Sequence, residues 1–350
     1  MNLQYHYDTS GNLTKAVENI TQPDALILLT TAESLESHVA ELEKAFPGIP
    51  SIGGIAMSYG GTHTIEQGVT VISLYGTDCA ADVLEQLSTM PVKYITRLKK
   101  AIEKTNAVSG TSACFDICSG HDGKLVTTLN MMLASRNIPL IGGTVDGGKV
   151  AVNGKVYEDA CGFLILRNKT GKICAYKENL YTATGDQFLA TKTDPDNNLL
   201  IEVDGRPAEN FYRDILHISK EEVATQTFKN PIGRVYGSET YLISIKDIKD
   251  NALECYKQVN NLDILTLMEI GDYDKIISET LQKMKKDLPD IKGILSVNCL
   301  FRYLLFKEDH YLDKYLTKMN STADHTGIVG LGEHYKKQHV NQTMCCITFD

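Results

Sequence analysis

The sequence lacks the features of membrane, secreted and nucleic-acid-binding proteins. No stretch approaches the ~20 consecutive apolar residues that a bilayer-spanning helix needs. Residues 1–8 do not show the cationic and then apolar order of a signal peptide, so we expect a cytoplasmic protein without membrane insertion. The net charge is −9 and no Lys/Arg stripe is present. Binding to nucleic acid is therefore not expected, because nothing would offset phosphate repulsion.

The cysteines and histidines do not form a metal-binding pattern. Nine cysteines are an odd number in a chain without a secretion signal, which favours reduced thiols. Cys114 and Cys118 fall in one expected strand, and no second pair completes a tetrahedral set. His334 and His339 flank two lysines and show no ligand spacing. We predict no metal and no cofactor.

Common catalytic motifs are missing as well. A nucleophile elbow around Ser58 would need glycine where Ala56 stands. The segment SGHDGKL, residues 119–125, has too few residues between its glycines for a P-loop. The segment GGTVDGG, residues 142–148, lacks the Gly-x-Gly-x-x-Gly order of a dinucleotide-binding turn. No Ser-His-Asp or paired-carboxylate signature can be assembled from spacing alone.

The chain does contain an internal repeat. The motif Ile-Pro-x-Ile-Gly-Gly occurs at residues 49–54 and again at residues 138–143. Each motif follows an apolar run typical of a buried strand and a segment with helical spacing, and precedes a further strand. The order strand, helix, glycine-bearing strand, turn, strand occurs a third time in residues 292–349. A spacing this long favours duplicated half-domains over a solenoid.

These patterns predict an α/β protein of two domains with mixed sheets and covering helices, because 350 residues exceed the usual limit of one core. We place the domains at residues 1–212 and 213–350, and the duplicated halves of the first at about 24–76 and 113–168. We expect stacked sheets with helices outside, and a pseudo-twofold relation between the halves. The glycine pairs should allow close packing, with ligand contact as a second use of Gly53, Gly54, Gly142 and Gly143.

Four stretches, in this order, give the chain a resemblance to a known family. They are the Ile-Gly-Gly segment at 52–54, EVDGRPAENFYRDIL at 202–216, NCLFR at 298–302, and GLGEHY followed by NQTMCCITF within 330–349. With them the sequence resembles the FIST proteins, in which paired FIST N and FIST C domains form an intracellular sensory module. The resemblance covers nearly the whole chain, from about residue 25 to residue 349.

The resemblance implies a sensor that binds a small polar metabolite, with amino acids suggested for the family. Family members are often joined to signalling modules. This chain looks like a free-standing FIST protein, so the resemblance implies that its signal passes through a protein partner or an oligomer.

Candidate ligand-binding residues cluster in the last third of the chain. Cys299 and Arg302 follow an expected buried strand at the start of an expected helix, where backbone N–H groups favour negative charge. Arg302 would pair with a ligand carboxylate. Cys299, next to Asn298, would have a lowered pKa. Both match a Cys-x-x-Arg element of the FIST C domain. The other interpretation is a buried thiol and an arginine that bridges the domains.

Gly332 and Glu333 are the second part of this candidate site. Glu333 would accept a ligand ammonium group, so that together with Arg302 it would suit a zwitterion such as an amino acid. The alternative is an acidic residue at a turn that organises local hydrogen bonds. Two other functions stay open: an enzyme that uses Cys299 as nucleophile or redox thiol with His334 as base, and a ligand-free interaction scaffold.

Overall fold

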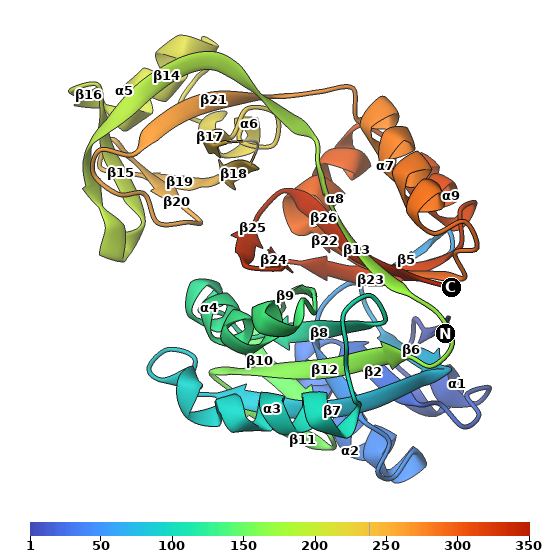
Figure 1. Cartoon of the computed structure of the whole chain (residues 1–350). Helices are drawn as coiled ribbons and strands as arrows, with labels where there is room; N and C mark the ends of the chain where they lie inside the picture. Colours follow the sequence, from blue (N-terminus) through green and yellow to red (C-terminus); the bar gives the residue numbers. More distant parts are fainter. Residues whose placement is uncertain (238) are drawn as a thin grey trace. The chain divides into compact units, whose positions relative to one another are not determined.

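The computed structural model describes residues 1–237 and 239–350, which divide into two compact units (Figure 1). Unit 1 comprises Met1–Glu178, Ile277–His339 and Thr343–Asp350, and unit 2 comprises Asn179–Ile276 and Val340–Gln342. The units do not follow the predicted division at residue 212, because the chain leaves unit 1 after Glu178 and later returns to it. That division stays a prediction about sequence modules.

Within the described residues, the strands of unit 1 form three mixed sheets of six strands each. The first sheet has the order β1 (Asn2–Asp8), β6 (Val69–Tyr75), β2 (Ala25–Thr30), β3 (Ser51–Ile55), β10 (Asp146–Val152), β11 (Lys155–Glu158). The second has the order β7 (Thr77–Glu85), β12 (Ala160–Asn168), β8 (Ser112–Cys118), β9 (Leu140–Thr144), β24 (Gly332–Tyr335), β25 (Gln338–Val340). The third has the order β13 (Ile173–Asn179), β26 (Thr343–Phe349), β22 (Gly293–Cys299), β23 (Asp324–Gly330), β4 (Ser58–Gly60), β5 (His63–Ile65).

The three sheets share one pairing plan. In each, the first strand of a repeat lies parallel to its second strand and antiparallel to its last strand: β2 with β3 and β6, β8 with β9 and β12, β22 with β23 and β26. The repeat of strand, helix, strand and strand predicted from the sequence is therefore present, and unit 1 contains it three times.

Each repeat gives a hairpin to the sheet of another repeat. The β10–β11 hairpin of the second repeat completes the first sheet, β24–β25 of the third completes the second, and β4–β5 of the first completes the third. The expected pseudo-twofold relation between two halves is wrong, because the exchange closes only when the third repeat takes part.

Helices cover the outer faces of these sheets. In unit 1 they are α1 (Leu13–Val17), α2 (Leu35–Ala45), α3 (Ile95–Lys104), α4 (Asp122–Leu133), α7 (Tyr273–Asp287), α8 (Leu300–Glu308) and α9 (Leu312–Asn320), with the short helices η1 (Ala32–Ser34), η2 (Pro91–Tyr94) and η3 (Ala134–Arg136). Their apolar faces form the cores: α1 and α2 pack on the first sheet, and α3 and α4 on the second. Helix α2 ends before Pro47-Gly48, as the sequence predicts.

The paired glycines allow close packing between backbones and between sheets. A Cβ on Gly54 would lie 2.7 Å from Val145 Cγ2 and 3.3 Å from Ile117 Cγ2 of the second sheet. A Cβ on Gly143 would lie 2.9 Å from Val297 Cγ1 of the third sheet. Gly53 and Gly142 lie against the neighbouring parallel strands in the same way. The packing role expected for these glycines is confirmed.

Unit 2 is a smaller sheet with two helices, inserted between β13 and α7. Its strands run in the order β18 (Glu239–Ile243), β17 (Ile232–Tyr236), β21 (Ile264–Ile270), β14 (Tyr181–Asp194), β15 (Leu199–Val203), β20 (Ala252–Cys255), β19 (Ile245–Lys249), and β16 (Arg206–Pro207) pairs with β15. Helices α5 (Ala208–Leu216) and α6 (Val223–Gln226) and the short η4 (Pro195–Asn197) complete it. Helix α5 begins at Ala208, where the sequence predicts it.

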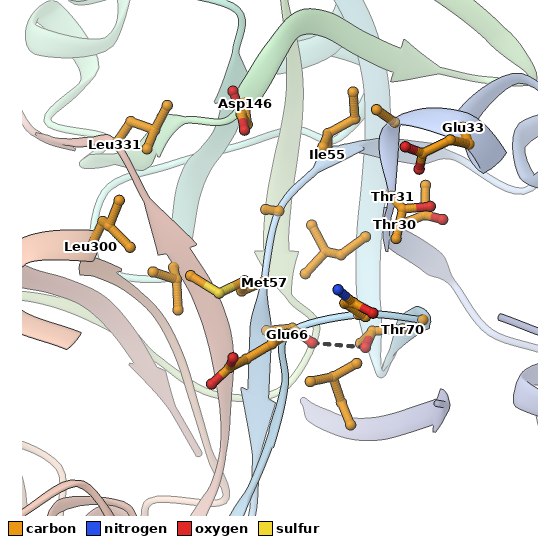
Figure 2. A pocket seen from close by; sticks show the side chains of 18 residues that line it. Thr30, Thr31, Glu33, Ile55, Met57, Glu66, Thr70, Asp146, Leu300 and Leu331 are labelled. Atoms are coloured by element: carbon orange, nitrogen blue, oxygen red, sulfur yellow. Dashed lines mark hydrogen bonds between the residues drawn. The ribbon is translucent and has the colours of Figure 1, made fainter. Parts of the chain in front are cut away.

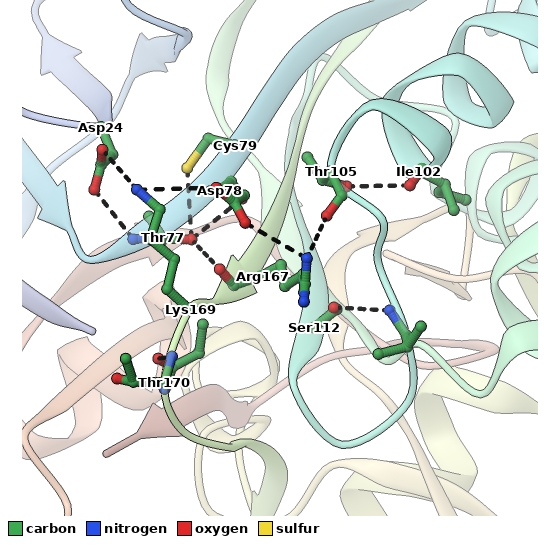
Figure 3. A network of polar contacts seen from close by, with 12 residues as sticks. Asp24, Thr77, Asp78, Cys79, Ile102, Thr105, Ser112, Arg167, Lys169 and Thr170 are labelled. Carbon is green, nitrogen blue, oxygen red and sulfur yellow. Dashed lines mark hydrogen bonds and ion pairs between the residues drawn. The ribbon is translucent and has the colours of Figure 1, made fainter.

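A polar network joins strand ends of the first and second sheets (Figure 3). The N–H of Thr77 donates to Asp24 Oδ2 (3.1 Å), and Lys169 Nζ lies 3.3 Å from Asp24 Oδ1. The hydroxyl of Thr77 donates to the carbonyl oxygen of Arg167 (3.0 Å). These contacts fix the passage from β6 to β7.

Among the described helices, none combines the length and apolar character that crossing a bilayer requires.

Candidate functional site

Unit 1 has a hollow of ≈ 310 Å³ where β2 and β3 end (Figure 2). This volume lies at the lower end of the range for small-molecule sites. The described residues that line it are Leu29, Thr30, Thr31, Ala32, Glu33, Ile55, Ala56, Met57, Ser58, Ile65, Glu66, Gln67, Gly68, Thr70, Asp146, Leu300, Val329 and Leu331.

The position of the hollow follows from the topology. The carboxyl ends of parallel strands leave a crevice where the chain turns away to its next element, and ligands of α/β proteins bind in such crevices. Here β2 turns into η1 after Thr30, and β3 continues through Ile55 towards β4. The third repeat supplies Leu300, at the start of α8, and Val329 of β23. With Asp146 of β10 from the second repeat, all three repeats contribute residues to the hollow.

Some polar groups of the hollow are held in place by hydrogen bonds. Ser58 Oγ lies 2.7 Å from Thr70 Oγ1, a contact drawn in Figure 2, and 3.1 Å from Tyr5 Oη. Thr30 Oγ1 lies 2.7 Å from Nδ1 of the buried His38. These hydroxyl groups belong to ordered networks, so their positions are fixed by the fold before any ligand arrives.

The charge of the lining is negative. Glu33, Glu66 and Asp146 are exposed, whereas the apolar residues Leu29 and Val329 are buried. Lys307 and Tyr303 donate hydrogen bonds to Glu66 Oε1 at 2.6 and 2.8 Å and lower the pKa of this carboxyl group. None of the described lining residues is Lys, Arg or His. The hollow therefore combines a carboxylate rim with apolar depth.

Arg302, the main residue of the predicted site, lies in the core between the third sheet and its helices. Its Nη2 donates to Glu178 Oε1 of β13, and both side chains are buried, with exposed fractions of 0% and 1%. The guanidinium carbon lies 5.0 Å from the ring centroid of Phe306 and 5.4 Å from that of Tyr315. In unit 1 this guanidinium neutralises an internal carboxylate.

Asn298 and Cys299 end β22 directly before α8. Cys299 is the N-cap residue of α8, so the predicted helix start is confirmed, and the residue is buried. Asn298 is fully buried, and neither Nδ2 nor Oδ1 has a hydrogen-bond partner in the described part of the chain. Neither residue lines the hollow, but the next residue, Leu300, does.

Glu333 lies on the opposite face of the third sheet from Arg302. Its Oε2 accepts hydrogen bonds from the N–H (3.1 Å) and the hydroxyl (2.7 Å) of Thr343. The Glu333 carboxylate helps to raise the pKa of Cys345, whereas the Arg302 guanidinium acts to lower the pKa of the next residue, Cys346. Neighbouring residues of a strand point to opposite faces. This placement gives no support to a clamp in which Arg302 and Glu333 hold one small zwitterion.

The glycines of the predicted site pack against neighbouring strands. Gly332 pairs with Thr144 in the ladder of β24 and β9, and a Cβ on Gly142 would clash with Asp116 Oδ1. None of Gly53, Gly54, Gly142, Gly143 or Gly332 is among the described residues that line the hollow.

Sequence reasoning missed a buried charge cluster around His334. Nδ1 of His334 lies 2.8 Å from Asp116 Oδ2, and Nε2 lies 2.9 Å from Asp122 Oδ1. Burial opposes the charged ring, but the two carboxylates raise the pKa of His334 well above its ordinary value. Both ring nitrogens are thus engaged, which leaves the proposed pairing with Cys299 without support. An aspartate inside the apolar strand CFDIC was the available signal.

The chain was compared with known proteins. The model of the FIST N domain matches residues 24–206, and the model of the FIST C domain matches residues 208–336. No curated protein matches the chain. The two matches meet inside unit 2, so both sequence domains contribute to both spatial units. FIST domains are sensory domains, and together they cover nearly the whole chain. The resemblance predicted from the sequence is therefore confirmed, and the chain belongs to the FIST family of sensory proteins.

Proposed function

We propose that this FIST protein senses a small metabolite with a cationic amino group, an amino acid or another small amine, in the hollow of unit 1. The observation that supports this most strongly is the composition of the rim. The rim carries the carboxylates of Glu33, Glu66 and Asp146, of which only Glu66 is paired with a lysine, Lys307, and no Lys, Arg or His is among the described lining residues. An ammonium group would be attracted to such a rim, and an anion would be repelled.

The inner part of the hollow suits the rest of such a ligand. Leu29, Ile65 and Val329 offer apolar contact, and the hydroxyl groups of Ser58 and Thr70 offer a few fixed polar contacts. Ligand sites are commonly built in this way, from apolar walls and a small number of positioned polar groups. The volume of ≈ 310 Å³ favours a metabolite over a large cofactor.

A sensor must respond differently in its free and bound states. The hollow is lined mainly by two groups of residues, those of the first repeat and Leu300 and Val329 of the third, and Asp146 of the second repeat also lines it. A ligand that touches both groups would stabilise one arrangement of α8 relative to the first repeat. We propose that a signalling partner recognises this difference. A cytoplasmic location fits the free state of all nine cysteines.

Asn298, Cys299 and Arg302 would then act indirectly. They surround the start of α8, whose first residue, Leu300, lines the hollow. Arg302 anchors this turn through Glu178. We propose them as positioning residues for the wall of the hollow.

The test is a thermal-shift screen of the full chain against amino acids, small amines and dicarboxylates. At a concentration 100 times its Kd, a ligand stabilises the folded state by about 2.7 kcal/mol. This corresponds to a rise in Tm of about 5–10 °C for a unit of this size. Amines should give the shift, and dicarboxylates should not.

Matched variants locate the binding. Glu33→Gln and Asp146→Asn should each reduce the shift produced by the active amine, because each removes one rim charge. Glu36→Gln is the control, since Glu36 lies on α2 outside the hollow and pairs with Lys149 (2.8 Å). Stabilisation by dicarboxylates alone, or an amine shift that both rim variants retain in full, would contradict the proposal.

A further inference from the structure

A second polar site lies at the second sheet, where β8 ends and α4 begins, and shares no lining residue with the hollow. Four potential metal ligands meet there. They come from β8, α4, β24 and β25 and are Cys118, Asp122, His334 and His339. Among the described residues, Cys118 and His334 also place ligand atoms within 4.8 Å of each other and of Asp116. Asp122 is the centre of the group. Its Oδ1 lies 2.9 Å from His334 Nε2, 3.7 Å from His339 Nε2 and 4.0 Å from Cys118 Sγ.

These separations are close to those of a tetrahedral metal site. Zinc binds nitrogen and oxygen at about 2.0–2.2 Å and sulfur at about 2.3 Å, so neighbouring ligand atoms of the tetrahedron are about 3.3–3.7 Å apart. The three observed distances of 2.9, 3.7 and 4.0 Å bracket this range.

The surroundings of two ligands resemble the outer shell of a metal site. Asp116 Oδ2 accepts the Nδ1–H of His334 at 2.8 Å, which leaves Nε2 directed at Asp122. Carboxylates in this position orient metal-bound histidines and set their tautomer. The N–H of Gly120 donates to Cys118 Sγ at 3.4 Å, as backbone groups do to metal-bound sulfur.

We propose that Cys118, Asp122, His334 and His339 bind one divalent ion of the zinc class, with Asp116 as the outer-shell carboxylate. A mixed sulfur, nitrogen and oxygen donor set suits zinc better than magnesium or calcium, which prefer oxygen. Four protein ligands make a closed site, and closed zinc sites are structural. The ion would fasten the exchanged β24–β25 hairpin of the third repeat to the second.

An ion can reach this site from solvent. The side chains of Asp122 and His339 are 16% and 21% exposed, whereas those of Asp116 and His334 are fully buried. The ion would therefore enter from solvent past the side chain of His339 and bind the buried ring of His334 on its inner side. His339 is also the ligand whose substitution disturbs the core least.

The experiment measures metal binding to the full chain. Protein treated with a chelator is titrated with Zn²⁺ under equilibrium dialysis, and bound zinc is determined by elemental analysis. We expect one ion per chain. In Co²⁺-loaded protein we expect a thiolate-to-cobalt charge-transfer band. This band should disappear in Cys118→Ser, and His339→Gln should weaken zinc binding about tenfold or more, by analogy with outer-shell losses of 10–100-fold.

His121→Asn is the matched control. His121 lies next to Asp122 but is exposed, and asparagine tolerates its left-handed backbone (φ 57°). This variant should bind zinc like the wild type. Folded wild-type protein that takes up no stoichiometric zinc would overturn the proposal. So would unchanged zinc affinity in His339→Gln together with an unchanged cobalt spectrum in Cys118→Ser. Should Cys118→Ser fail to fold, His339→Gln alone decides.

Discussion

Mild acid should destabilise unit 1 through His325, a histidine of β23 with only 2% of its surface exposed. Its Nε2 lies 2.8 Å from Ser296 Oγ, and its ring lies 5.2 Å from that of Tyr59 and 6.2 Å from that of Tyr315. Its Nδ1 has no hydrogen-bond partner within the described residues. Burial without a neighbouring carboxylate lowers the pKa of His325 to about 3.

The size of the effect follows from the pKa difference between the unfolded and folded states. The unfolded chain binds a proton at His325 with a pKa of about 6.5, whereas the folded chain does so only near 3. The neutral form is therefore favoured by folding. Its contribution is complete above pH 6.5 and is lost as the pH falls towards 3. At pH 5 the loss from this one group is about 2 kcal/mol.

The measurement compares wild type with His325→Phe by urea unfolding at pH 7 and pH 5. Phenylalanine keeps the ring contacts but cannot bind a proton, so its stability lacks this pH dependence. At pH 7 the variant should be less stable by about 1 kcal/mol, because the hydrogen bond with Ser296 is lost. At pH 5 the difference should shift by about 2 kcal/mol in favour of the variant. The exposed residue His63 provides the control variant His63→Phe. A difference between wild type and His325→Phe that is the same at both pH values would refute the reasoning.

Three further predictions concern buried positions. Arg302→Met should lower the free energy of urea unfolding by about 3–5 kcal/mol, because it leaves the Glu178 carboxylate buried without its partner. Adding Glu178→Met should restore most of this loss. A double variant as unstable as the single one would contradict the assignment. Gly142→Ala should lower the free energy of unfolding by about 1–3 kcal/mol, since its Cβ would clash with a side-chain and a backbone oxygen of Asp116. Gly123→Ala, with open space in α4, should raise Tm. Asn298→Leu should stabilise the protein by about 1–3 kcal/mol in the same assay, because it removes two unpaired amide atoms; a loss of stability would mean that this amide has a partner in solution.

Local features of the fold could be predicted from the sequence. Helix α2 stops before Pro47, and α5 starts at Ala208. The order of helices and strands in each repeat could also be predicted, because apolar runs and helical spacing are local signals. Such signals depend on neighbouring residues only.

Partner choice between distant elements could not be predicted in this way. A strand that joins the sheet of another repeat has the same alternation of apolar and polar residues as a strand that pairs within its own repeat. The same limit applies to the sites. Arg302 matches a family element, but its partner Glu178 lies 124 residues away. His334 meets Asp116 across 218 residues, and nothing in the spacing of either residue indicates the other.

The three repeats share one strand arrangement but hold different side chains at an equivalent position. Leu28, Asp116 and Ser296 occupy the same place in the three repeats, each opposite a glycine of the neighbouring parallel strand. That glycine leaves space beside each of them. In the first repeat this residue, Leu28, belongs to the apolar core. In the second repeat the carboxylate of Asp116 contacts His334, and in the third the hydroxyl of Ser296 contacts His325. Because the packing that defines the fold is supplied by the strands and glycines, the side chain at this place is free to differ. The proposed ligand and metal sites share no residue, so a substitution in one site leaves the residues of the other unchanged.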